Sequence, residues 1–221
     1  MTLPVYQSFN EGKTAGATTV VVPKPSGVVS GDLLIGFLSS DGGGETHLPP
    51  SGWNVIYNNV SESSSKQTFS LWWRVATGTE GSSFTFQCTS SSEALYAWVI
   101  RISGAHQTDP IHKKNIYSGD SLNTIHIAVT TEVDDCLMVW AFGADHGDVT
   151  IDGGWQYNET NITVDKSDTG NGSCSGGCAW ENQVDAGDSG AGRCDLTGIE
   201  EWVAVTIAIQ PPAGGAFEYT G

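Results

Sequence analysis

Tryptophan is the side chain best suited here to bind a ligand, because an exposed indole ring can stack on a sugar or on another aromatic ring. Trp72 lies on the opposite strand face from the apolar residues around it, and Trp180 lies in an acidic loop. We predict that these two are exposed, in a ligand or subunit contact. The other six of the eight tryptophans are assigned to the core because they fall at repeat landmarks or on apolar strand faces: Trp53, Trp73, Trp98, Trp140, Trp155 and Trp202.

Acidic side chains are concentrated in the second half of the chain. Residues 124–210 carry 15 acidic and two basic side chains. A solvated surface explains this excess most simply, so no metal site and no cofactor are assigned. Calcium is the alternative, because hard cations need several converging oxygens. Two loops offer such oxygens, one with Asp145, Asp148 and Asp152 and the other with Asp165, Asp168 and Asn171.

The five cysteines fall into two groups. Cys88 and Cys136 stand in apolar alternating runs, where a cysteine acts as a small buried hydrophobe. Cys174, Cys178 and Cys194 share a glycine-rich region, where a disulfide, a metal cluster and free thiols all remain open. The C-x3-C spacing without a nearby histidine makes zinc the weakest of the three.

One short string resembles an enzyme signature. Gly187-Asp-Ser-Gly190 is similar to the nucleophile sequence of trypsin-like serine proteases, but Ala191 replaces the glycine that follows it there. His47 lacks the setting of that family's general base, and no aspartate is marked to orient it. His126 alternates with isoleucines and is predicted to point outward from a strand. No catalytic residue is assigned, and the chain is predicted not to be an enzyme.

Composition narrows the remaining classes. The chain has 221 residues, of which 15% are charged and 28 are glycine, and its net charge is −16. Such a charge repels a phosphate backbone, so nucleic acid is not expected as a partner. No run of 18 apolar residues predicts a membrane span, and the first residues lack the pattern of a secretory signal. We therefore expect synthesis and folding in the cytoplasm.

Alternating polar and apolar residues, bounded by glycine, proline, asparagine and serine clusters, predict strands throughout and no helix. The predicted strands are 18–22, 32–39, 53–60, 67–77, 82–88, 94–103, 124–129, 136–143, 155–164 and 201–210.

The order of landmarks repeats along the chain. Thr18, Asp32, Trp53 and Tyr96 recur at offsets of about 102 to 106 residues as Thr124, Asp135, Trp155 and Trp202. The chain is thus predicted to be all-β, a jelly-roll-like β-sandwich built from two tandem pseudo-repeats whose apolar faces press together. An N-terminal arm (1–16) precedes the sandwich (17–210), in which a linker (105–123) joins repeat one (17–104) to repeat two (124–210).

The C-terminal tail, 211–221, lies outside the repeat. It begins with two prolines and contains Phe217 and Tyr219 as anchor candidates. A frayed end is one interpretation, and an arm that docks on a neighbouring subunit is the other.

The strings Gly31-Asp-Leu-Leu-Ile-Gly-Phe37, Pro49-Pro-Ser-Gly-Trp53 and Leu71-Trp-Trp-Arg-Val-Ala76 resemble a diffuse family of β-sandwich proteins in tailed bacteriophage virions. The resemblance implies a capsid decoration or cement protein on the outer surface of the phage particle. It also implies contact with the major capsid protein and self-association, as a trimer. The alternative is a glycan-binding adhesin or receptor-binding module on a virion appendage or a cell surface.

Overall fold

A computed structural model describes residues 3–62, 66–89, 92–146, 155–157, 159–168 and 172–212. These residues form thirteen strands and no helix, which confirms the all-β prediction. Within the described part of the chain, no helix has the length and apolar character needed to cross a bilayer.

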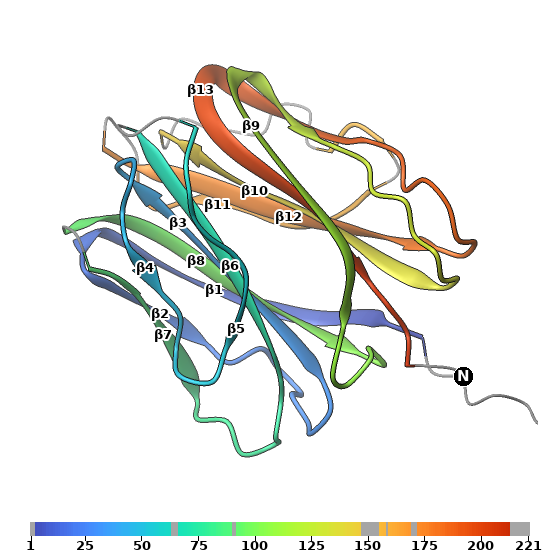
Figure 1. The fold of residues 1–221 in the computed structure, drawn as a ribbon. Coiled ribbons are helices and arrows are strands. Elements are labelled where there is room, and N and C mark those ends of the chain that lie inside the picture. The colour runs from blue at the N-terminus through green and yellow to red at the C-terminus, as the bar shows by residue number, and fades with distance from the viewer. Residues whose placement is uncertain are drawn as a thin grey trace, which may run out of the picture.

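The strands form three antiparallel sheets (Figure 1). The first sheet has the order β1 (Val5–Ala17), β8 (Glu93–Ser103), β3 (Leu33–Asp41), β6 (Gln67–Val75) and β5 (Asn54–Val60). The second has the order β11 (Thr160–Lys166), β12 (Cys174–Gln183), β10 (Cys136–Asp145), β13 (Gly192–Ile209) and β9 (Ile111–His126). The third is small and has the order β2 (Thr19–Pro23), β7 (Ser83–Cys88) and β4 (His47–Leu48).

The main core lies between the two five-stranded sheets. Alternate residues of β3, such as Ile35 and Phe37, share one apolar cluster with Val139 and Ala141 of β10. Each sheet hides its apolar face on the other, as the period of two in the sequence requires. The predicted sandwich is therefore confirmed, while its jelly-roll character stays a prediction.

A third layer covers the outer face of the first sheet (Figure 1). Val22 of β2 and Phe86 of β7 pack there on Leu34, Trp72 and Val99. Trp72 is fully buried, so the prediction that it is exposed is wrong. The face opposite the main core is not a solvent face, because the chain folds β2 and β7 back over it.

The two halves have the same strand order. Reading β1-β8-β3-β6-β5 against β9-β13-β10-β12-β11 matches each strand of the first sheet to one of the second. A tandem duplication would produce this arrangement. The expected arm (1–16) contains most of β1, and the expected linker (105–123) contains most of β9, so both supply edge strands of the matched sheets.

The sheet registers shift one landmark of the repeat by a residue. Leu33 pairs with Ile102, and Leu137 pairs with Ile209, which makes Leu33 and Leu137 equivalent positions. Tyr96 faces the main core, whereas Trp202 faces the opposite side of its sheet. Since successive side chains of a strand point to opposite faces, Trp202 does not match Tyr96 in the structure.

Strand β12 was missed by the sequence analysis because its Cys-Ser-Gly-Gly-Cys start is typical of a loop. It is nevertheless a central strand, paired with β10 and β11. A Cβ atom at Gly176 would lie 2.7 Å from the Trp98 ring and 2.8 Å from the Phe142 carbonyl oxygen. The small residue thus lets the two sheets approach each other around the fully buried indole of Trp98.

We predict that Gly176→Ala destabilises the protein by about 1–3 kcal/mol, because neither neighbour can move without disturbing the packed interface. Gly16→Ala is the matched control, since a Cβ atom there meets nothing within 4 Å. Urea denaturation followed by tryptophan fluorescence measures both. Equal stability of the two variants would contradict the close approach at β12.

Candidate functional site: a cleft at one sandwich edge

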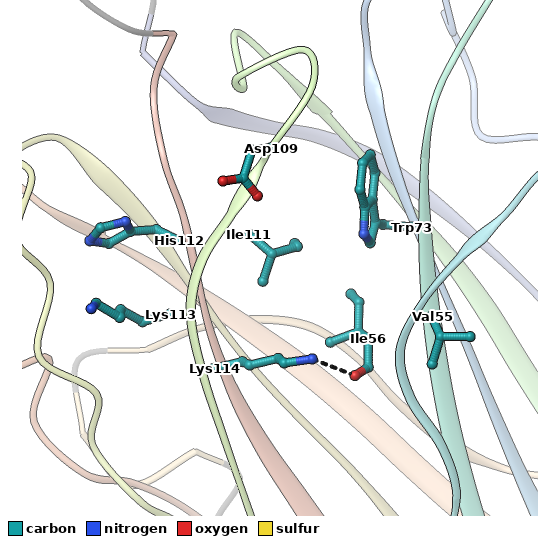
Figure 2. Close-up of a pocket in the computed structure, with 8 residues that line it drawn as sticks. All are labelled: Val55, Ile56, Trp73, Asp109, Ile111, His112, Lys113 and Lys114. Carbon is teal, nitrogen blue, oxygen red and sulfur yellow. Dashed lines mark hydrogen bonds between the residues drawn. The ribbon is translucent and has the colours of Figure 1, made fainter.

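A cleft of about 350 Å³ opens where the edge of one sheet meets the edge of the other (Figure 2). Val55 and Ile56 come from β5 and Trp73 from β6, and the opposite wall is the start of β9. The cleft is lined by Val55, Ile56, Trp73, Asp109, Ile111, His112, Lys113 and Lys114. Sequence analysis assigned Trp73 to the core, but its side chain is only partly buried and borders this opening.

A β-bulge sets the directions of the side chains on β9. Ile209 pairs with Ile111 and Ala208 pairs with Lys113, so His112 has no partner residue across the ladder. In Figure 2, Ile111 and Lys114 consequently point toward β5 and β6, and His112 and Lys113 point the other way. His112 Nε2 accepts a hydrogen bond from the Glu132 backbone N–H at 3.0 Å.

Lys114 bridges the two sheets at the floor of the cleft. Its Nζ donates a hydrogen bond to the Ile56 carbonyl oxygen at 2.7 Å and lies 4.6 Å from the centre of the Tyr57 ring. The exposed carboxylate of Asp109 lies at the upper rim (Figure 2). The cleft thus combines an apolar wall, an indole ring, one carboxylate and one ammonium group, a composition that is typical of ligand-binding sites.

The equivalent edge of the second copy is filled. Trp73 pairs with Ile35 as Trp180 pairs with Val139, so the two tryptophans occupy matched positions. Against Trp180 lies the ring of Tyr6, stacked at 5.9 Å between ring centres. Burial raises the pKa of the Tyr6 hydroxyl to about 12. Trp180 is therefore half-buried and covered by a neighbouring ring, and is not the open platform that was predicted.

The position of Tyr6 in the first copy corresponds to Ile111 in the second. Tyr6 pairs with Ile102, and Ile111 pairs with Ile209, at the equivalent step of the ladder. An isoleucine is smaller than a tyrosine and offers no flat face. The cleft beside Trp73 is thus the space that an aromatic ring takes up at the other edge, and only a comparison of the two copies in three dimensions shows it.

The protease-like string does not assemble a triad. Ser189 Oγ accepts a hydrogen bond from the Val129 backbone N–H at 3.0 Å and donates one to the Gly190 carbonyl oxygen. Ser189 borders a second cleft of about 390 Å³ whose described lining holds Glu159 and Glu181 and no histidine. The serine hydroxyl is thus engaged by backbone and lacks a neighbouring base within the described residues.

Two histidines are buried and serve the fold. The ring of His47 hydrogen-bonds with Ser40 Oγ at 2.8 Å and Ser70 Oγ at 3.0 Å. His126 hydrogen-bonds with the Val205 carbonyl oxygen at 3.1 Å and is fully buried. The prediction that His126 points outward is wrong, because the end of β9 folds over the outer face of its own sheet. Burial lowers the pKa of His47 to about 3 and that of His126 to about 4.

All five cysteines are free and buried. Cys174 and Cys178 lie in the core between the two large sheets, and Cys194 lies on the other side of the second sheet. No pair among them forms a disulfide and no three share a metal site, which leaves free thiols of the three alternatives. Burial raises the pKa of Cys174 and of Cys194 to about 12, so these thiols are poor nucleophiles.

The remaining predicted residues are placed only in part. Phe217, Tyr219, Asp148, Asp152 and Asn171 lie outside the described residues. Asp165 forms an ion pair with Lys13 of β1. Asp145 is buried and lies beside His146 and Glu200, which the sequence analysis did not select.

No known family matches the chain, and neither the curated proteins nor the solved structures include a match to it.

We predict that the two buried histidines make the fold acid-sensitive. Below pH of about 6.5 an unfolded histidine takes up a proton that the folded state excludes, so stability falls as the pH falls toward the folded pKa. His126→Gln should reduce the stability lost between about pH 6.5 and 4.5 by about 2 kcal/mol, from its lowered pKa. Urea unfolding at a series of pH values checks this. Parallel curves for the wild type and the variant would contradict it.

Proposed function

We propose that the protein is a non-enzymatic virion structural protein, a capsid decoration or cement protein that self-associates and bridges capsid subunits. The family resemblance of its first half supports this, and so does the filled interior of the sandwich. Among the described residues no nucleophile, base and orienting group come together. The outer surfaces and the sheet edges remain for contact with other proteins.

The observation that carries the proposal is the open cleft beside Trp73. At the equivalent edge the ring of Tyr6 stacks on Trp180, whereas the space beside the indole of Trp73 is open. An aromatic anchor in such a pocket is the usual centre of a protein interface. We propose that a neighbouring copy supplies the ring, from Phe217 or Tyr219.

The position and charge of the tail fit this occupant. Gln210, just before the tail, donates a hydrogen bond to the Asp109 carbonyl oxygen at the rim of the cleft. Phe217 stands five residues after Pro212 and Tyr219 stands seven residues after it, so an extended chain would reach about 16–25 Å from Pro212 to these anchors. Lys114, at the floor of the cleft, is one of only nine basic side chains, and Glu218 stands between the two aromatic residues in the sequence. In the proposed contact, the negative charge of Glu218 would be attracted to the ammonium group of Lys114.

We predict that Ile111→Tyr and deletion of residues 213–221 each convert the assembled protein to a monomer. The tyrosine would stack on Trp73 as Tyr6 stacks on Trp180, and the deletion would remove the anchors. Ile125→Tyr is the control, because Ile125 is an exposed isoleucine of the same strand outside the cleft. Light scattering after size-exclusion chromatography measures the mass. A trimer that persists in both variants would refute the proposed contact between the tail of one copy and the Trp73 cleft of the next.

We predict that antibody labelling or electron cryomicroscopy places the chain on the head of the phage whose genome encodes it, at junctions between capsid subunits. Particles lacking it should break at lower temperature, because each bridge adds buried area between subunits. Detection only at a tail tip, or in no virion, would exclude a decoration role.

The second candidate function is a glycan-binding adhesin, and the composition of the same cleft favours it. The indole of Trp73 can stack on a pyranose ring, and the Asp109 carboxylate can accept hydrogen bonds from its hydroxyl groups. In this case a glycan array should show binding that Trp73→Ala reduces at least tenfold and that deletion of 213–221 leaves unchanged. Loss of binding on deletion, or no binding to any glycan, would speak against it.

A further inference from the structure

The interior of the sandwich ends in a polar layer at the end opposite the Trp73 cleft. Beyond the last apolar pairs, the facing strands contribute Ser39 and Asp41 from β3, Gln67 from β6, Asp145 from β10 and Glu201 from β13. Four of these five are buried, and Asp41 is partly buried. Polar groups in such a position are usually hydrogen-bonded or bound to an ion.

Two carboxyl groups from the facing sheets meet in this layer. The carboxyl groups of Asp41 and Asp145 lie within hydrogen-bonding distance of each other. Two partly desolvated carboxylates side by side repel each other unless a proton or a cation lies between them. Lys66 Nζ lies 3.7 Å from the carboxylate of Glu201, and its side chain is half exposed.

The ligand atoms for a cation are already gathered. Asp145, His146 and Glu200 each offer one atom, and these atoms all lie within 4.8 Å of one another. The ligands of one first-row metal ion, bound at about 2.0–2.2 Å, lie about 3–4.5 Å apart. Among the described residues, the buried Nδ1 of His146 has no hydrogen-bond partner.

A second observation, independent of the acidic groups, concerns Gln67. Its side chain is 1% exposed, yet within the described part of the chain neither its amide oxygen nor its amide nitrogen has a partner. The hydroxyl of Ser39 is buried and unpartnered too. A Cβ atom at Gly143 would lie 2.6 Å from Gln67 Nε2 and 2.9 Å from Ser39 Oγ. Both groups therefore point into the space next to Asp145, two residues along the same strand face.

A buried polar group without a hydrogen-bond partner destabilises a fold, so such a group usually marks the place of a water molecule or an ion. Gln67 pairs with Asp41 across β3 and β6, so its amide lies on the same face as that carboxyl group. An ion held by the carboxylates would bind the Gln67 amide oxygen directly, or would hold a water molecule that hydrogen-bonds with the Gln67 amide. The acidic groups and the amide thus call for the same kind of ligand.

We propose that this end of the sandwich binds one divalent first-row metal ion, Mn²⁺ or Zn²⁺, through Asp145, His146 and Glu200, with Asp41 as the fourth ligand. One imidazole among carboxylates favours these ions over Ca²⁺, which prefers oxygen alone. The ion joins β3 of one sheet to β10 and β13 of the other, so it pins the two copies together.

The test is calorimetric titration of chelator-treated, full-length protein with MnCl₂ and with ZnCl₂. We expect one ion per chain and a higher unfolding temperature with metal. Asp145→Asn and Glu200→Gln should each weaken binding at least tenfold. Asp134→Asn is the matched control, because Asp134 is an exposed acid next to the other end of β10.

The unfolding temperature of each metal-free variant distinguishes loss of a metal ligand from misfolding. Asp145→Asn removes the repulsion with Asp41, so its metal-free form should unfold at a temperature no lower than that of the wild type. Visible absorption of the Co²⁺ form should change in His146→Ala if the imidazole is a ligand. No binding of Mn²⁺ or Zn²⁺ to the wild type would overturn the proposal, as would binding of Ca²⁺ alone. Unchanged affinity in both carboxylate variants would place the ion elsewhere.

Discussion

The constraint on which the rest of the molecule depends is that every large sheet is apolar on both faces. β3 and β10 are buried along almost their whole length, so a simple two-layer sandwich would leave two apolar outer faces in water. The chain removes this surface by covering the first sheet with the small sheet β2-β7-β4 and the second sheet with the end of β9 and the start of β13. Burial at about 25 cal/mol per Å² makes such a cover strongly favourable. The outer layers are thus a consequence of the composition of the central strands.

Covering the faces leaves the sheet edges as the places where the two copies can differ. The strand orders bring β1 beside β11 at one side of the sandwich and β5 beside β9 at the other. At the first side Tyr6 fills the gap against Trp180, and at the second Ile111 leaves it open against Trp73. Because the two halves share one strand order, each edge can be compared with its counterpart in the other half. The position where one copy lacks the filling ring is where an external group has room to bind.

Local pattern predicted most strands and the sandwich, because a period of two reports directly on which residues share a face. It failed where the tertiary environment decides. The start of β12 has small side chains because the Trp98 ring packs directly against Gly176. The local sequence of β12 does not indicate that a tryptophan from another strand lies there. Trp72 and His126 lie on faces that alternation marks as outward, and both are buried by strands that fold over them. The cleft beside Trp73 could not be predicted from the sequence, because it is recognised only by comparison with the other edge, where Tyr6 fills the equivalent space.

The contact between Asp41 and Asp145 follows from the same symmetry. Leu33 and Leu137 are equivalent, and eight residues further along each strand stand Asp41 and Asp145, so two copies of one position meet between the sheets. Two residues earlier, Ser39 likewise faces Gly143, its own counterpart. A residue near the axis that relates two copies is brought against itself, which for an apolar side chain is harmless and for a carboxylate is not. Loss of one side chain, as at Gly143, creates room, and a cation between the two acids would turn the repulsion into a bond between the halves.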